Sequence, residues 1–182
     1  MKQQERIKER EKKIKPELAK ELGKKNIMAV PKLRKVVVST GTGSTAQREK
    51  KRQELILDRF TKITGQKPLK KGAKKSIASF KTRIGDVIGM TVTLRGDRMY
   101  GFLDKLFGVA IPRIRDFRGI EQNVVDEMGN MTIGIKEHTV FPETADEDLK
   151  DVFGLAVTIV TTAKTKQDAL AFFHAIGVPL KK

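Results

Sequence analysis

The chain has 182 residues, a length that suits a single domain over residues 1–182 with a hydrophobic core of its own. Its 38 lysines and arginines exceed its 22 acidic residues and give a net charge of +16, which is typical of a nucleic-acid-binding protein and less so of a membrane-surface protein, because no strongly basic amphipathic helix is evident. The absence of cysteine excludes disulfides and thiolate metal sites, and with no apolar run of membrane-spanning length and no secretory signal we expect a cytoplasmic protein without a membrane partner.

The first segment of the chain is strongly charged. Residues 1–15 alternate basic and acidic side chains and predict a helical or frayed N-terminal arm, either solvated or in contact with RNA. Pro16 is expected in the first turn of the next helix, where a proline costs no backbone hydrogen bond. Leu18 and Leu22 lie one helical turn apart and would dock this helix, and Gly23 would end it.

A strand is predicted within KLRKVVVSTGTG, residues 32–43. Val36 and Val38 share one face of this strand, and Lys35 and Ser39 share the other. Its glycine-rich end matches the G-x-G-x-x-A form of a dinucleotide fingerprint, but no acidic residue follows at the end of a second strand to hold a ribose. We therefore expect a tight turn there and no cofactor.

A helix predicted over 47–64 leads into a basic segment and then a second amphipathic strand. No acidic residue occurs between Thr61 and Arg83. Over 87–95, the side chains that would face the core are Ile88, Met90, Val92 and Leu94, and those that would face away are Gly89, Thr91, Thr93 and Arg95. A strand with a face of hydroxyls and a guanidinium, next to a cationic segment, predicts a nucleic-acid surface.

Asp97 is expected to cap the next helix. That helix carries an apolar stripe at helical spacing, which predicts core packing: Met99, Phe102, Leu103, Leu106, Phe107 and Ala110. Pro112 disfavours a helix interior, so Arg113, Arg115 and Arg118 should lie on an ordered loop, where they could contact RNA, form a subunit interface or pair with Asp116.

The last third of the chain predicts two more strands and a helix. The strands are expected over 131–140 and in LAVTIVTTAK, and they flank an acidic patch around Asp146, interpreted as a solvated turn or a docking point for a basic protein. Thr165 with Asp168 resembles a capping box that opens a helix ending at Gly177. The predicted class is α+β, a largely antiparallel sheet with helices packed on one face in a single domain.

No catalytic or metal-binding constellation is recognisable. His138 and His174 lack the second histidine or spaced carboxylate of a metal site, and no Ser/His/Asp set is evident, so we expect a protein without metal, cofactor or enzymatic activity. An RNA-processing enzyme and a general nucleic-acid chaperone remain alternatives. With few aromatic residues available for stacking, recognition should depend on cations at phosphates and on hydroxyls at the sugars and base edges of folded RNA.

Six ordered blocks carry a resemblance to a known family. They are GQKP (65–68), AKKSIASFK (73–81), VTLRG (92–96), IPRIRDFRG (111–119), FPE (141–143) and IVTTAK (159–164). In order and spacing the chain resembles the bacterial type of the large-ribosomal-subunit protein five family, which binds 5S rRNA. The resemblance extends from about Leu18 to Lys182.

The resemblance implies a ribosomal protein of the central protuberance, with 5S rRNA, 23S rRNA, P-site tRNA, neighbouring ribosomal proteins and a small-subunit head protein as partners. It places rRNA-binding roles on Lys35, Ser39, Gln66, Thr93 and Arg95. It places a tRNA-contacting loop on Lys74, Lys75, Ser76, Ser79, Phe80, Lys81 and Arg83. Two positions depart from the family pattern: Ser39 stands where asparagine is usual, and Ala156 stands where an acidic residue is usual.

Overall fold

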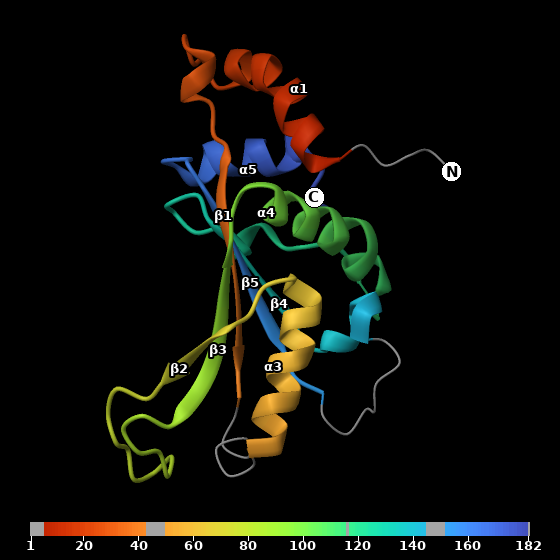
Figure 1. Ribbon diagram of the computed structural model, residues 1–182. Helices are drawn as coiled ribbons and strands as arrows, with labels where there is room; N and C mark the ends of the chain where they lie inside the picture. The colour runs from red at the N-terminus through yellow and green to blue at the C-terminus, as the bar shows by residue number, and fades with distance from the viewer. Residues whose placement is uncertain (1–5, 43–49, 116, 145–151, 182) are drawn as a thin grey trace. The chain divides into compact units, whose positions relative to one another are not determined.

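The computed structural model of the protein describes residues 6–42, 50–115, 117–144 and 152–181. Its sheet has the strand order β2-β3-β1-β5-β4 (Figure 1). The strands are β1 (Leu33–Gly41), β2 (Leu69–Gly72), β3 (Val87–Leu94), β4 (Met131–Ile135) and β5 (Leu155–Thr161), and the α-helices in the described ranges are α1 (Ile7–Glu21), α3 (Lys50–Thr64), α4 (Gly96–Lys105) and α5 (Lys166–Ile176). The predicted α+β class with a largely antiparallel sheet is confirmed.

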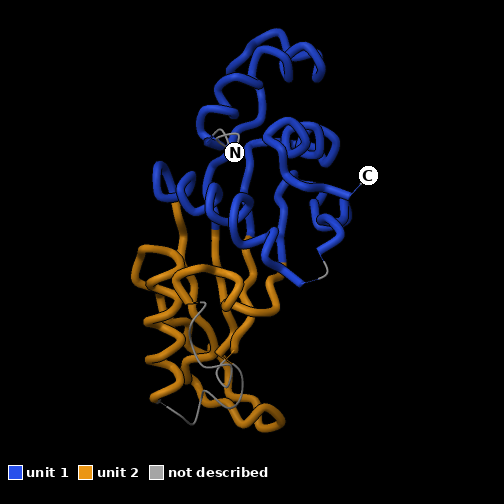
Figure 2. The backbone as a smooth tube through the Cα atoms, turned by 90° about the vertical axis from the view of Figure 1, so that its right-hand side faces the viewer, with its two compact units in different colours: residues 1–36, 95–133, 158–182 blue, residues 37–94, 134–157 orange. Residues whose placement is uncertain are grey.

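The chain divides into two compact units (Figure 2). Unit 1 consists of residues 1–36, 95–133 and 158–182, and unit 2 consists of residues 37–94 and 134–157. The boundary falls within β1, β4 and β5, so each of these strands contributes residues to both units. No helix among the described residues has the length and apolar character needed to cross a membrane.

In unit 1, α1 packs against α4 and α5. The structure corrects the predicted position of Pro16, which lies inside α1 because the helix begins at Ile7. An internal proline removes one backbone hydrogen bond, but Leu18 and Ala19 are buried, and this packing favours the helix despite the proline. The backbone N–H of Ile7 donates to Asp104 Oδ1 at 2.8 Å, which satisfies a free amide at the start of α1.

The predicted ends of α4 and α5 had different outcomes. Thr165 caps α5 as expected, since its Oγ1 accepts from the N–H of Asp168 at 3.2 Å, and Gly177 ends the helix with φ +91°. The prediction for Asp97 is wrong: Arg95 occupies the N-cap position of α4, and Asp97 lies in the first turn. There its carboxylate pairs with Lys8, which lowers the pKa of Asp97.

In unit 2, α3 packs against β3. Ile56, Phe60 and Ile63 are buried at the helical spacing expected of them. The prediction of a strand through residue 140 is wrong, because β4 ends at Ile135 and His138 begins a 3-10 helix, η5 (His138–Val140). The glycine-rich turn after Thr42 lies outside the described residues, and so does the acidic patch apart from Glu143, which is exposed.

Candidate nucleic-acid interface

The side chains of β1 alternate as the sequence predicts. Val36 and Val38 are fully buried, whereas Lys35, Val37 and Ser39 on the other side are half-buried. Because side chains in a strand alternate between faces, Ser39 presents its hydroxyl on the side that carries no core residue. In unit 2 this side of β1 therefore combines one apolar and one hydroxyl group.

The same alternation holds over most of β3. Met90, Val92 and Leu94 are buried, while Thr91 is half-buried and Thr93 is exposed. Ile88 is the exception and corrects the prediction: it belongs to the apolar face by its position in the strand, yet it is 41% exposed. The apolar row of β3 therefore begins at Ile88, but the buried part of that row begins only at Met90.

Strands β1 and β3 approach each other closely in unit 2. Thr91 Oγ1 donates to the carbonyl oxygen of Val38 at 3.4 Å. A Cβ at Gly89 would lie 2.9 Å from the carbonyl oxygen of Thr40, so only glycine fits there without displacing backbone. Ser39, Thr91 and Thr93 thus lie on two closely packed strands. A binding site needs such support, because its side chains must be held in a fixed geometry.

Lys35 and Arg95 extend these two rows of side chains along the chain. Lys35 precedes Val37 by two residues within β1 and is half-buried. Arg95 follows Thr93 by two residues, has an extended backbone with φ −140° and ψ 161°, and is exposed. Both are assigned to unit 1, whereas Ser39 and Thr93 are assigned to unit 2.

Gln66 lies between α3 and β2 in unit 2. Gly65 ends α3 with φ +65°, and its N–H donates to the carbonyl oxygen of Thr61 at 2.8 Å. The carbonyl oxygen of Gln66 accepts from Thr64 Oγ1 at 3.0 Å. The backbone of Gln66 is therefore fixed, while its side chain is only half-buried and is available to a ligand.

The predicted tRNA-contacting loop is the connection between β2 and β3 (Figure 1). Its tip is ordered by reciprocal backbone hydrogen bonds between Ile77 and Thr82 at 3.1 and 3.2 Å. Asp86 closes its base, since Oδ2 accepts from the N–H of Arg83 at 2.7 Å and its carbonyl oxygen accepts from the N–H of Ala73 at 2.8 Å. The predicted contact residues are all exposed in the structure: Lys74, Lys75, Ser76, Ser79, Phe80, Lys81 and Arg83.

Exposed apolar side chains distinguish this loop from an ordinary charged turn. Phe80 is 68% exposed and Ile84 is 71% exposed, although both are large apolar residues. Lys81 has φ +52°, a conformation that non-glycine residues rarely adopt. The loop therefore offers cations together with apolar contact surface, which is suited to a second anionic ligand with exposed bases or sugars.

The predicted arginine cluster lies in unit 1. Arg113 is the last residue of a short 3-10 helix, Ile111–Arg113, so the prediction of a loop is wrong for it, whereas Arg115 and Arg118 lie outside any helix or strand; all three are exposed. Asp116, the proposed ion-pair partner, lies outside the described residues. The three guanidiniums are thus available at the surface of the described chain.

Sequence reasoning missed a pair of hydroxyls in unit 1. Thr132 Oγ1 and Thr158 Oγ1 lie 3.1 Å apart on β4 and β5, and both residues have side chains at least partly exposed. The sequence could have indicated this pair, because each threonine alternates with buried residues in its strand, Thr132 with Ile133 and Thr158 with Ile159.

Among the described residues, no group of three or more acidic or histidine side chains is arranged to hold a metal ion.

Comparisons with known proteins cover nearly all of the chain. A family model described as ribosomal protein L5 matches residues 26–83, and a second one, described as the C-terminus of the same ribosomal protein family, matches residues 87–180. Large ribosomal subunit protein uL5 of Ureaplasma urealyticum is 48% identical over 170 residues, which is 93% of this chain and 92% of that protein. The protein of the same name from a Thermoanaerobacter species is 47% identical over 172 residues, or 94% and 96% of the two chains. The chain belongs to the ribosomal protein L5 family.

Proposed function

We propose that this protein is a structural constituent of the large ribosomal subunit in the cytoplasm, where it binds 5S rRNA in the central protuberance, next to 23S rRNA. Its relatives are named large ribosomal subunit proteins, and ribosomal protein L5 is not a family of enzymes. The observation that carries the proposal is the alternation in β1 and β3. Ser39 and Thr93 leave hydroxyls on the side opposite the buried residues.

Charge and hydroxyls together favour folded RNA as the ligand. With a net charge of +16, phosphate contacts would supply much of the affinity, and the 2′-hydroxyls in the wide minor groove of an RNA helix suit serine and threonine side chains. Lys35, Gln66 and Arg95 would add charged and amide donors to the hydroxyls of Ser39 and Thr93. Serine at position 39 has a shorter reach than the asparagine usual in the family, so this contact would be direct only where the RNA comes close.

The loop between β2 and β3 is the proposed contact to P-site tRNA. Its backbone is held by its own hydrogen bonds, so the conformation of the loop does not depend on 5S rRNA. The arginine cluster of Arg113, Arg115 and Arg118 is proposed to contact RNA or a small-subunit head protein. Neighbouring proteins of the central protuberance complete the set of partners.

We expect Thr93→Ala or Arg95→Ala to weaken binding to 5S rRNA by about 1–3 kcal/mol, the usual loss for a directed contact. Lys74→Ala should change the same affinity little, because Lys74 lies in the loop proposed to serve tRNA. Filter binding with purified protein and 5S rRNA measures all three variants. Equal losses for Lys74→Ala and Arg95→Ala would contradict the division between the strand surface and the loop.

Specificity separates this proposal from the two alternatives. Similar affinity for 5S rRNA, an unrelated RNA of equal length and duplex DNA at about 0.15 M salt would indicate a general nucleic-acid chaperone instead. Magnesium-dependent cleavage of the RNA that is lost in a carboxylate variant would indicate an enzyme. The proposed function requires selective binding of 5S rRNA that remains intact.

A further inference from the structure

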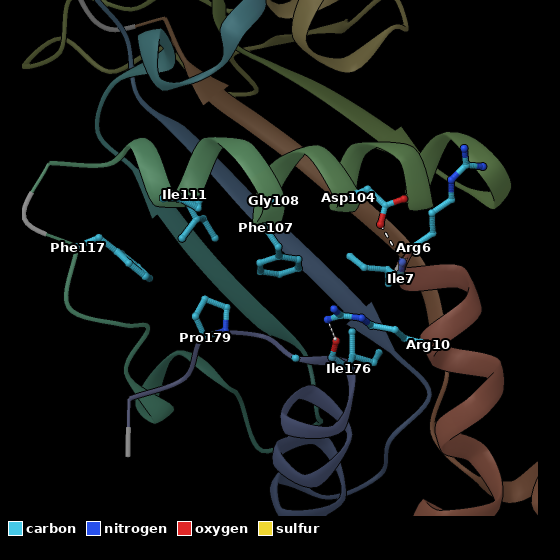
Figure 3. A pocket seen from close by; sticks show the side chains of 12 residues that line it. Arg6, Ile7, Arg10, Asp104, Phe107, Gly108, Ile111, Phe117, Ile176 and Pro179 are labelled. Atoms are coloured by element: carbon cyan, nitrogen blue, oxygen red, sulfur yellow. Dashed lines mark hydrogen bonds between the residues drawn. The ribbon is translucent and has the colours of Figure 1, made fainter. Parts of the chain in front are cut away.

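Unit 1 contains a pocket that the proposed functions leave unused. Its volume is about 460 Å³, within the range of small-ligand sites. It lies between the start of α1, the segment that follows α4, and the end of α5 (Figure 3). Its apolar lining includes Ile7, Phe107, Ile111, Phe117, Ile176 and Pro179.

An irregular helical segment shapes one wall of the pocket. After α4 the chain forms a π-helix, η2 (Leu106–Ala110), a rare conformation that occurs often at functional sites. Leu106 and Ala110 are buried in the core, whereas Phe107 is only half-buried, and its ring faces the pocket (Figure 3). The apolar stripe predicted for this helix therefore gives one aromatic ring to the pocket and keeps the others in the core.

The polar groups of the pocket include both donors and acceptors. Arg10 points into the pocket, and its Nη1 donates to the carbonyl oxygen of Ile176 at 3.2 Å (Figure 3). A guanidinium carries five N–H groups, so it retains donors for a second acceptor. A Cβ at position 177 would lie 2.6 Å from Arg10 Nη1, so Gly177 leaves the space that the guanidinium occupies.

Acceptors in the lining argue against a purely anionic occupant. Asp104 lines the pocket with a carboxylate, and Ile176 belongs to the C-terminal end of α5, where the helix dipole is negative. With Arg6 and Arg10 also in the lining, the pocket presents donors and acceptors together, and an acidic peptide could satisfy only the donors. A nucleobase instead carries acceptors for Arg10, donors for a carboxylate or carbonyl, and a flat face that stacks on Phe107.

From these contacts we infer that the pocket binds one splayed-out nucleobase of ribosomal RNA, with Phe107 as the stacking surface and Arg10 as the donor to the base edge. The inference rests on the proposed function, since it takes rRNA as the partner. The exposed arginines at 113, 115 and 118 follow Ile111 and Pro112 of the pocket lining in the chain and would contact the adjoining phosphates.

Two variants of the full-length protein test this site. Phe107→Leu removes the ring and keeps an apolar side chain, and we expect it to weaken binding to the rRNA that supplies the base by about tenfold, the effect of one lost stacking contact. Arg10→Met should have a similar effect. Lys12→Met is the matched control, because it removes one exposed positive charge from the same helix outside the pocket lining and should change binding little.

Binding is measured by filter binding to deproteinised 5S rRNA and 23S rRNA, each alone. Zero-length ultraviolet crosslinking followed by peptide mapping should place a nucleotide adduct on Phe107 or Phe117, and Phe107→Leu should reduce it. Circular dichroism establishes that each variant is folded. If RNA binding still depends on Thr93 while Phe107→Leu and Arg10→Met bind as Lys12→Met does, the pocket proposal is overturned and the proposed function stands.

Two other outcomes also overturn the pocket proposal. A short peptide of alternating glutamate and phenylalanine that binds in a Phe107-dependent manner, without any RNA adduct in the pocket, would show a protein-docking site. No binding of either RNA by the unaltered protein would refute both the pocket and the proposed function.

Discussion

Acidification from neutral pH to about pH 4 is expected to lower the free energy of unfolding by roughly 3 kcal/mol, because the pKa of His138 is lower in the folded protein than in the unfolded chain. His138 is fully buried in unit 2, and burial, reinforced by the charge of Arg59, lowers its pKa from 6.5 to about 4. The Arg59 Nη1 lies 3.5 Å from His138 Nε2, and the imidazole stacks on Phe153 with ring centroids 4.1 Å apart. These surroundings favour the neutral ring.

The sign of the effect follows from which state binds the proton first. Between pH 6.5 and pH 4 the unfolded chain protonates His138 while the folded protein does not, so the free energy of unfolding falls as the pH falls. The stabilisation is fully present above the unfolded pKa of 6.5. It is lost by the time the pH reaches the folded value.

Urea unfolding followed by circular dichroism at a series of pH values measures this loss. His138→Phe keeps an aromatic ring against Phe153 and should remove the contribution of the imidazole, so its stability should depend less steeply on pH between 6.5 and 4. His174 is exposed, and His174→Gln is the matched control that should keep the steep dependence. Carboxylates titrate in all three proteins, so identical slopes for His138→Phe and the unaltered chain would contradict the prediction.

Features set by short-range patterns were predictable from the sequence. The cap of α5 needs only Thr165 and the N–H three residues later, and the alternation in β1 needs only the period of a strand. The half-buried position of Ser39 and the exposed position of Thr93 follow from that same period once Val38 and Val92 are buried. These local rules placed the side chains of the candidate interface on the correct sides of their strands.

Features that depend on contacts between residues far apart in the sequence were not predictable. Nothing near Ile88 in the sequence indicates that the buried surface ends before it. The start of α1 at Ile7 depends on contacts with residues about a hundred positions away, such as Asp104. The pocket of unit 1 combines Arg10, Phe107 and Ile176, which only the fold brings together, and the helical spacing of Phe107 placed it with the core residues.

The second large effect on stability is expected from the contact between α1 and α4. Glu11 is only 4% exposed, although it belongs to the charged segment predicted to be a helical or frayed arm. Tyr100 OH donates to Glu11 Oε2 at 2.7 Å, and burial, with Glu11 as the hydrogen-bond partner, raises the pKa of Tyr100. We expect Tyr100→Phe to destabilise the protein by about 2 kcal/mol, because it removes the donor from a buried carboxylate.

A double-mutant cycle separates this hydrogen bond from simple packing. Glu11→Leu combined with Tyr100→Phe removes both polar partners, so it should cost less than the sum of the single changes, by about 1–2 kcal/mol. Glu9→Leu, at an exposed position of the same helix, is the control and should be additive with Tyr100→Phe. Strict additivity for Glu11 and Tyr100 in urea unfolding would mean that α1 is held by apolar contacts such as Leu18, and that the buried carboxylate contributes nothing specific.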